Sequence, residues 1–119
     1  MSFKFEKLEI WKLAIELAND VHLLTRIFPK EEMYSLSSQM KRAADSISMN
    51  IAEGSTGQSD AEQTRFLGYA LRSALEVVNR LYLAIKRSYI EHNQFDKLYN
   101  DLEKLIAKIQ AFKNAIKKQ

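Results

Sequence analysis

Four polar residues in the middle of the chain are of types that can do chemistry. Arg42, Asn50 and Glu53 recur at helical spacing in one segment, and Glu76 follows in a later one. A carboxylate acts as a general acid or base when its pKa is shifted, so Glu53 and Glu76 are candidates for that role. The alternative is structural: Arg42 bridges to Glu53 or Glu76 of its own chain or of a neighbouring subunit. Polar groups of this kind fix register and partner choice, and we favour this interpretation.

Other motifs that support catalysis or cofactor binding are missing from the sequence. His22 and His92 lie far apart, and neither belongs to the Glu-x-x-His pairs of ferritin-like metal bundles. The chain has no Cys, which excludes thiolate catalysis and thiolate metal sites. The loop at Gly54 and Gly57 lacks the spacing of a phosphate loop, and there is no Gly-x-Ser-x-Gly elbow. We therefore expect no enzyme activity, no metal and no cofactor.

Positive charge is concentrated toward the C-terminal end of the chain. The net charge is +3, but residues 1–85 sum to −1, residues 86–119 sum to +4, and no acid follows Glu103. A basic end attracts polyanions, which makes five lysines candidates for nucleic-acid binding: Lys104, Lys108, Lys113, Lys117 and Lys118. The alternative is that lysines near a helix C-terminus only complement the helix dipole and keep the end solvated.

Four segments with helical periodicity position these residues. The spacing of apolar residues predicts helices over 8–27, from within 31–36 to 54, over 59–87, and from about 93 to the C-terminal end. Short connections between them favour antiparallel neighbours. With 46% apolar and 28% charged residues, the composition is that of a folded globular protein. We predict an all-α protein, a single domain over 1–119, folded as an up-down-up-down antiparallel four-helix bundle.

Residues known to begin and end helices mark the boundaries of these segments. Pro29 disfavours helical backbone just before it and so ends the first helix. Gly54 is suited to the position after the second helix. Ser59 and Glu62 have the spacing of a capping box at the start of the third helix, and Asn93 is the expected N-cap of the fourth.

The first predicted helix has more apolar surface than one bundle core requires. One face carries Ile10, Leu13, Ala14, Leu17, Val21 and Leu24, and a second face carries Leu8, Trp11, Ile15 and Ala18. The two faces cover an arc of roughly 200°, which is wide enough for two partners. The candidate subunit interface therefore combines part of the second face with the polar residues of the later helices: Trp11, Ile15, Ala18, Arg42, Asn50, Glu53 and Glu76.

Residues 28–54 resemble the four helix bundle protein family, also called 23S ribosomal RNA intervening-sequence proteins. The pattern of that family is approximately F-P-x-x-E-x-Y-x-L-x-x-Q-x-x-R-A-A-x-S-I-x-x-N-I-A-E-G, and this chain follows it from Phe28 to Gly54. The flanking matches are Phe5, Leu8 and Trp11 in the first helix, and Phe66, Leu67, Ala70, Ser73 and Glu76 in the third. Ser35 departs from the pattern, since the family commonly has Gly there.

The resemblance implies a bundle that assembles as a ring, often a pentamer. The family name comes from genes inside insertions of bacterial large-subunit ribosomal RNA genes and does not make the chain a ribosomal protein. A related group, the accessory variability proteins of diversity-generating retroelements, is similar and binds nucleic acid and a reverse transcriptase. We expect a homo-oligomer without enzyme activity whose partner is RNA or DNA; the alternative is a scaffold ring that binds a protein and no nucleic acid.

The sequence also bears on where the protein resides. The first residues have no apolar leader region, and no apolar run reaches the length of a membrane span. We therefore expect a cytoplasmic protein without membrane contact.

Overall fold

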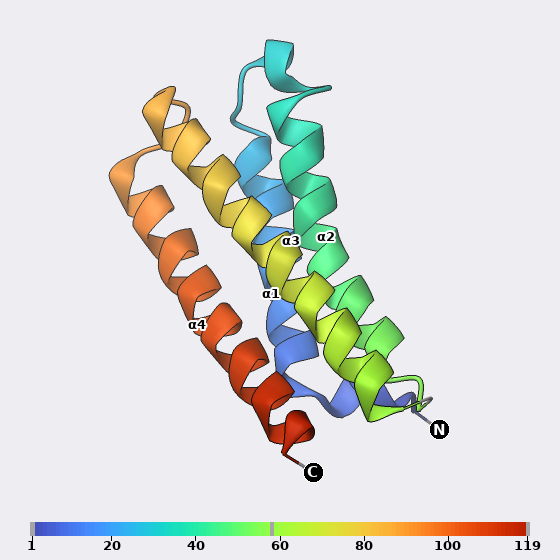
Figure 1. Ribbon diagram of the computed structural model, residues 1–119. Coiled ribbons are helices and arrows are strands. Elements are labelled where there is room, and N and C mark those ends of the chain that lie inside the picture. Colours follow the sequence, from blue (N-terminus) through green and yellow to red (C-terminus); the bar gives the residue numbers. More distant parts are fainter. Residues whose placement is uncertain (1, 58, 119) are drawn as a thin grey trace.

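The computed structural model describes residues 2–57 and 59–118 and is all-α over them. Four helices make up the fold: α1 over Glu9–Thr25, α2 over Leu36–Gly54, α3 over Asp60–Lys86 and α4 over His92–Lys117. Two short 3-10 helices, Lys4–Lys7 and Lys30–Glu32, precede α1 and α2. Successive helices run in opposite directions, so the ends of the chain and the α2–α3 turn share one end of the bundle (Figure 1). The predicted four-helix bundle is confirmed.

Most helix boundaries follow the predicted signals. The hydroxyl of Ser59 accepts the N–H of Glu62 at 3.1 Å, so Ser59 is the N-cap of α3 as predicted. The first helix ends at Thr25, two residues earlier than predicted. Ile27 and Phe28 instead donate to the carbonyls three residues back, a tightening typical of a last turn.

α4 begins at His92, one residue from the predicted start, but its N-cap differs from the prediction by two residues. The N-cap is Glu91, whose backbone N–H donates to the side-chain oxygen of Gln94 at 2.9 Å. The expected cap, Asn93, already lies within the helix and accepts the N–H of Gln94 at 2.9 Å. Asn93 was misleading because Asn is a common N-cap in general. The Glu91–Gln94 pair forms a capping box instead, which satisfies backbone N–H groups at two positions at once.

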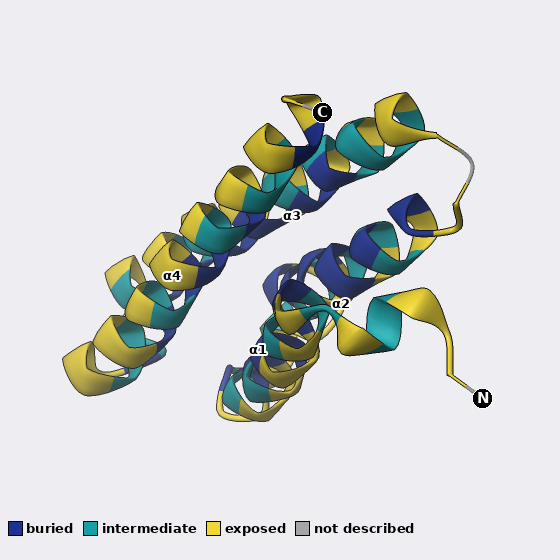
Figure 2. Cartoon of the chain, turned by 90° about the horizontal axis from the view of Figure 1, so that it is seen from below, coloured by how far each residue is buried: buried dark blue, intermediate teal, exposed yellow. Residues whose placement is uncertain are grey.

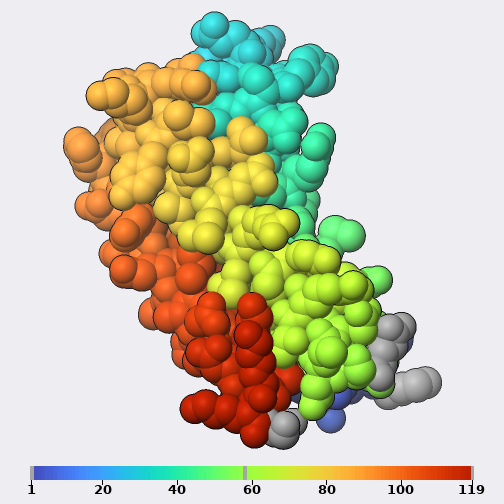
Figure 3. Space-filling view, viewed as in Figure 1, coloured from blue at the N-terminus to red at the C-terminus, as the bar shows by residue number. Residues whose placement is uncertain are grey.

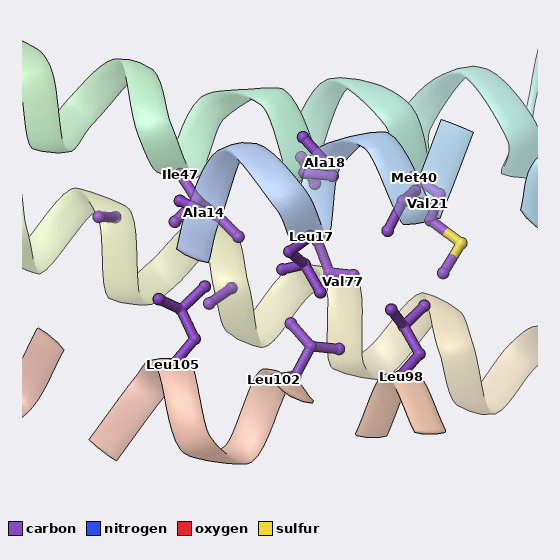
Figure 4. Packing of buried hydrophobic residues seen from close by; sticks show 14 of the residues in the cluster. Ala14, Leu17, Ala18, Val21, Met40, Ile47, Val77, Leu98, Leu102 and Leu105 are labelled. Carbon is purple, nitrogen blue, oxygen red and sulfur yellow. The ribbon is translucent and has the colours of Figure 1, made fainter. Parts of the chain in front are cut away.

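The apolar faces of all four helices meet in one core. Figure 2 shows the buried side of each helix turned toward the others and the exposed side turned outward. In the close-up of Figure 4, Leu17 of α1, Val77 of α3 and Leu102 of α4 lie together in this core. Burying a side chain of this size contributes about 1.5–3 kcal/mol, so the core is the main source of stability.

The second apolar face of α1 is partly covered by the chain itself. The ring of Phe5, in the first 3-10 helix, lies 5.0 Å from the ring of Trp11, and Trp11 is half-buried. Ala18 is buried in the core at 8% exposure, whereas Ile15 remains 43% exposed. Part of the second apolar face of α1 therefore packs against residues of the same chain and not against another subunit.

Glu32 joins the two connections at the upper end of the bundle. Its carboxylate accepts hydrogen bonds from the Ser35 hydroxyl at 2.6 Å, the Tyr89 hydroxyl at 2.7 Å and the backbone N–H of Leu36 at 3.4 Å. Arg87 adds an ion pair at 3.3 Å. These contacts tie the α1–α2 connection to the α3–α4 connection and cap the start of α2.

The seams between neighbouring helices differ in how closely the two helices approach each other. At the α2–α3 turn a side chain on Gly54 would place its Cβ 2.8 Å from the Cβ of Phe66, so only Gly allows this approach. The α1 and α4 helices have the fewest contacts of the four neighbouring pairs. Three hollows of about 270, 260 and 430 Å³ lie in a row along that seam.

Candidate functional site

The polar residues of α2 divide between the α2–α3 seam and the outer surface. Asn50 donates to the backbone oxygen and the hydroxyl of Ser46, both at 2.9 Å, and Ser73 of α3 donates to the same hydroxyl at 3.0 Å. Arg42 and Glu53 are exposed and contact no hydrogen-bonding or ionic partner among the described residues. Asn50 therefore has a role within one chain, whereas Arg42 and Glu53 are available to a second molecule.

The two carboxylates considered for acid–base chemistry lie at different levels of the bundle. Gly54 packs against Phe66 and Ser46 against Ser73, so Glu76 lies near the middle of α2. Ten residues of α3 separate Glu76 from the level of Glu53, a rise of about 15 Å. The Glu76 carboxylate pairs with the guanidinium of Arg80 at 2.9 Å. The structure does not bring Glu53 and Glu76 together in one pocket.

Three exposed apolar or aromatic residues, two on or beside α2 and one on α1, are further candidates for contact with another molecule, and the sequence reasoning missed the two at α2. Met49 is 69% exposed and lies on the same stripe as Arg42 and Glu53, seven residues after one and four before the other. Tyr34 is 89% exposed in the turn just before α2. Met49 could have been found because it is apolar but falls off the core stripe of Met40, Ala43, Ile47 and Ile51. Ile15 of α1 is the apolar residue that was anticipated.

The five candidate lysines all come from α4 and the residue after it, but they point to different sides. Lys108 pairs with Glu9 of α1 at 3.3 Å, and Lys104 lines a hollow that also contains Glu16 and Asp101. Both ammonium groups therefore lie over the α1–α4 seam near acids, where their attraction for an external anion is reduced.

The other three lysines lie toward the end of α4. The ammonium of Lys113 lies over α3, 3.6 Å from where a Cβ on Gly68 would be. Lys117 follows by one turn on the same side, and Lys118 comes directly after the helix. Lys117 and Lys118 are exposed and pair with no acid among the described residues. In the space-filling view of Figure 3, this part of α4 forms the lower end of the molecule.

The described parts of the chain contain no group of three or more His, Asp or Glu side chains placed to hold a metal ion. Separately, none of the helices over residues 2–57 and 59–118 is long and apolar enough to cross a membrane.

Comparison with known proteins agrees with this architecture. The family model of the 23S rRNA-intervening sequence protein matches residues 6–111. A crystal structure of a protein of unknown function from the S23 ribosomal protein family of Bacteroides thetaiotaomicron superposes with a TM-score of 0.82 at 26% identity. The match covers 88% of this chain and 95% of that one. No curated protein matches the sequence. The match over nearly the whole chain shows that the protein belongs to the 23S rRNA-intervening sequence protein family.

Proposed function

We propose that this protein is a non-enzymatic, self-associating bundle that binds RNA or another nucleic-acid backbone through the C-terminal end of α4. The observation that carries the proposal is the pair Lys117 and Lys118, which are exposed, unpaired among the described residues and located beyond the last acid of the chain. Lys113, on the same side of α4 as Lys117, adds a third cation. The association of this family with insertions in ribosomal RNA genes supports nucleic acid as the polyanion.

Self-association would strengthen the binding of nucleic acid by the weakly basic end of α4. The C-terminal end of α4 in one subunit offers only two or three free lysines, which neutralise few phosphates. In an assembly the same end is repeated in every subunit, and the linked sites bind with an affinity well above that of one site. The exposed stripe of Arg42, Met49 and Glu53 on α2 supports such an assembly, since an apolar side chain between two charges suits the centre of a contact.

Gel retardation of an RNA over a salt series tests the proposal. The native protein should retard RNA at low salt and lose affinity steeply as salt rises, because neutralised phosphates release counterions. Replacing Lys117 and Lys118 by Gln should weaken binding and make the salt dependence shallower. The control, Lys12→Gln with Lys86→Gln, removes the same charge from exposed positions elsewhere and should bind as the native protein does. No retardation at low salt would refute the proposal.

The competing candidate is a scaffold ring that binds a protein and no nucleic acid. It is favoured by the hollow of about 270 Å³ at the α1–α4 seam, whose lining includes Leu23 and Ile27, 48% and 53% exposed. The retardation series separates the two, because a scaffold of this kind shifts no RNA at any salt concentration.

A further inference from the structure

A second basic region lies at the opposite end of the bundle from Lys117 and Lys118. An open hollow of about 490 Å³ is bounded by the end of α1, the Lys30–Glu32 turn and the first part of α2. Four of its nine lining residues are basic: His22, Arg26, Lys30 and Lys41. In Figure 1 this region is the upper end of the molecule, where the blue and cyan segments meet.

The charge of this hollow is not neutralised by its own lining. None of its lining residues is acidic, whereas four other hollows on the described surface each contain at least one acid. Asp45 does not line the hollow, but its carboxylate Oδ1 lies 3.0 Å from Nε2 of His22, which does. Arg26, Lys30 and Lys41 make no ion pair with a described residue. Three free cations around one concave surface attract a phosphate strongly.

The remaining lining residues give the hollow an apolar floor and a neutral donor. Phe28, Pro29 and Met33 form the apolar part, and Met33 is 45% exposed there. Ser37 is buried at 7% exposure, lines the hollow and donates its hydroxyl to no described residue. Its hydroxyl is therefore free to donate to a ligand. The lining thus combines cations and a hydroxyl for a phosphate with apolar side chains for a flat ring.

We propose that this hollow binds one nucleotide unit, with its phosphate on Arg26, Lys30 and Lys41 and its base on the floor of Phe28, Pro29 and Met33. The volume lies within the range of small-ligand sites, and bases rest on apolar and aromatic side chains without regard to sequence. A free nucleotide and a nucleotide of a single-stranded RNA present the same chemistry. A base within a duplex does not, because it is stacked and paired. The inference deepens the proposed function, but its residues are separate from the end of α4.

Titration with adenosine monophosphate, followed by amide NMR shifts, tests the site directly. Saturable shifts should cluster in residues 22–41. Replacing Arg26 and Lys30 by Gln, both exposed and free of ion pairs, should weaken binding by about tenfold or more, while the Lys12→Gln, Lys86→Gln control should bind as before. Scattered shifts that do not saturate, or unchanged affinity in the double variant, would overturn the proposal.

Inorganic phosphate and a Met33→Ala variant separate a nucleotide site from a plain anion site. Phosphate should shift the same amides but bind about tenfold more weakly than adenosine monophosphate, because it leaves the floor empty. Met33→Ala should weaken the nucleotide and leave phosphate unchanged. Equal affinities for the two ligands, with no effect of Met33→Ala, would reject the nucleotide assignment.

Oligoribonucleotides distinguish the two sources of the nucleotide and the two proposals. A single strand of about 16 nucleotides should bind more tightly than a duplex of equal length and should lose affinity in the Arg26→Gln, Lys30→Gln variant. If Lys117→Gln with Lys118→Gln has no effect while the hollow variant does, the proposal for α4 fails and this one stands. If adenosine monophosphate binds but no RNA does, the proposed function fails and the hollow serves free nucleotides.

Discussion

At the scale of single residues, the family pattern divides into side chains with different roles. Ile47 is fully buried, and Asn50 is bonded within its own helix. Glu32 joins two connections through four partners, and these bonds, that from Ser35 foremost, lower the pKa of its carboxyl. Arg42 and Glu53 have no such role within the described chain. Arg42 and Glu53 are therefore available for contact with another molecule.

The lowered pKa of Glu32 predicts a pH dependence of stability. A carboxyl whose folded pKa is depressed stabilises the fold at pH values above the unfolded pKa, and this contribution is lost as pH falls through the folded pKa. Glu32→Gln should therefore lower the urea midpoint at neutral pH and have a smaller effect below roughly pH 4. The control is Glu31→Gln, an exposed neighbour outside the hydrogen-bond network. If Glu32→Gln lowered the urea midpoint equally at neutral and at acidic pH, the role given to the Glu32 carboxylate would be contradicted.

At the scale of elements, the sequence predicted helices better than their ends. The apolar periodicity of α2 and α4 and the N-cap at Ser59 were sufficient to locate the helices, because burial and capping act over a few residues. The N-cap of α4 was missed because two capping arrangements, at Glu91 and Asn93, compete within one turn. No local pattern indicated that Glu32 bonds Tyr89, since that contact exists only after four helices are assembled.

Gly54 is the position where the α2–α3 turn tolerates no side chain. Gly54→Ala would place a Cβ 2.8 Å from the Cβ of Phe66 and 3.3 Å from the backbone oxygen of Gln63. Such overpacking costs about 1–3 kcal/mol, and we expect the free energy of unfolding to fall by that amount in urea denaturation. An unchanged midpoint would mean that the helices approach less closely than described.

Gly68 gives the opposite expectation and serves as a matched comparison. A Cβ at Gly68 would meet only the flexible end of Lys113, at an ordinary 3.6 Å. Replacing a helix-interior Gly by Ala reduces the entropy lost on folding, so Gly68→Ala should raise the free energy of unfolding by roughly 0.5–1 kcal/mol. Destabilisation by Gly68→Ala in the same urea experiment would indicate that α3 is more tightly covered there.

At the scale of the whole molecule, the fold was predictable from the sequence, whereas the candidate binding surfaces were only partly predictable. Helix number, order and direction follow from periodicity and short connections. The basic hollow was not anticipated, because Arg26, Lys30 and Lys41 come from three segments that only the fold brings together. The pairing of Lys108 with Glu9 escaped notice for the same reason.

Self-association is the property that the stripe on α2 predicts for the whole protein. Light scattering at micromolar concentration should give a mass well above the 13.8 kDa of one chain. Met49→Glu should shift it toward the monomer, since burying an unpaired carboxylate costs several kcal/mol, and Arg42→Ala should lower the stability of the assembly more than Lys117→Ala. Asn79→Glu, which adds the same charge on the outer side of α3, is the control. A native monomer would refute the prediction.

The weak α1–α4 seam also has a consequence for the order of folding. In the described chain the other three seams join helices that follow one another, so their contacts form locally, whereas α1 and α4 must close a loop across the whole sequence. Proteins dominated by local contacts fold in milliseconds or less. We therefore expect this bundle to fold rapidly, with the α1–α4 seam the last to close and, in hydrogen exchange, the first to open.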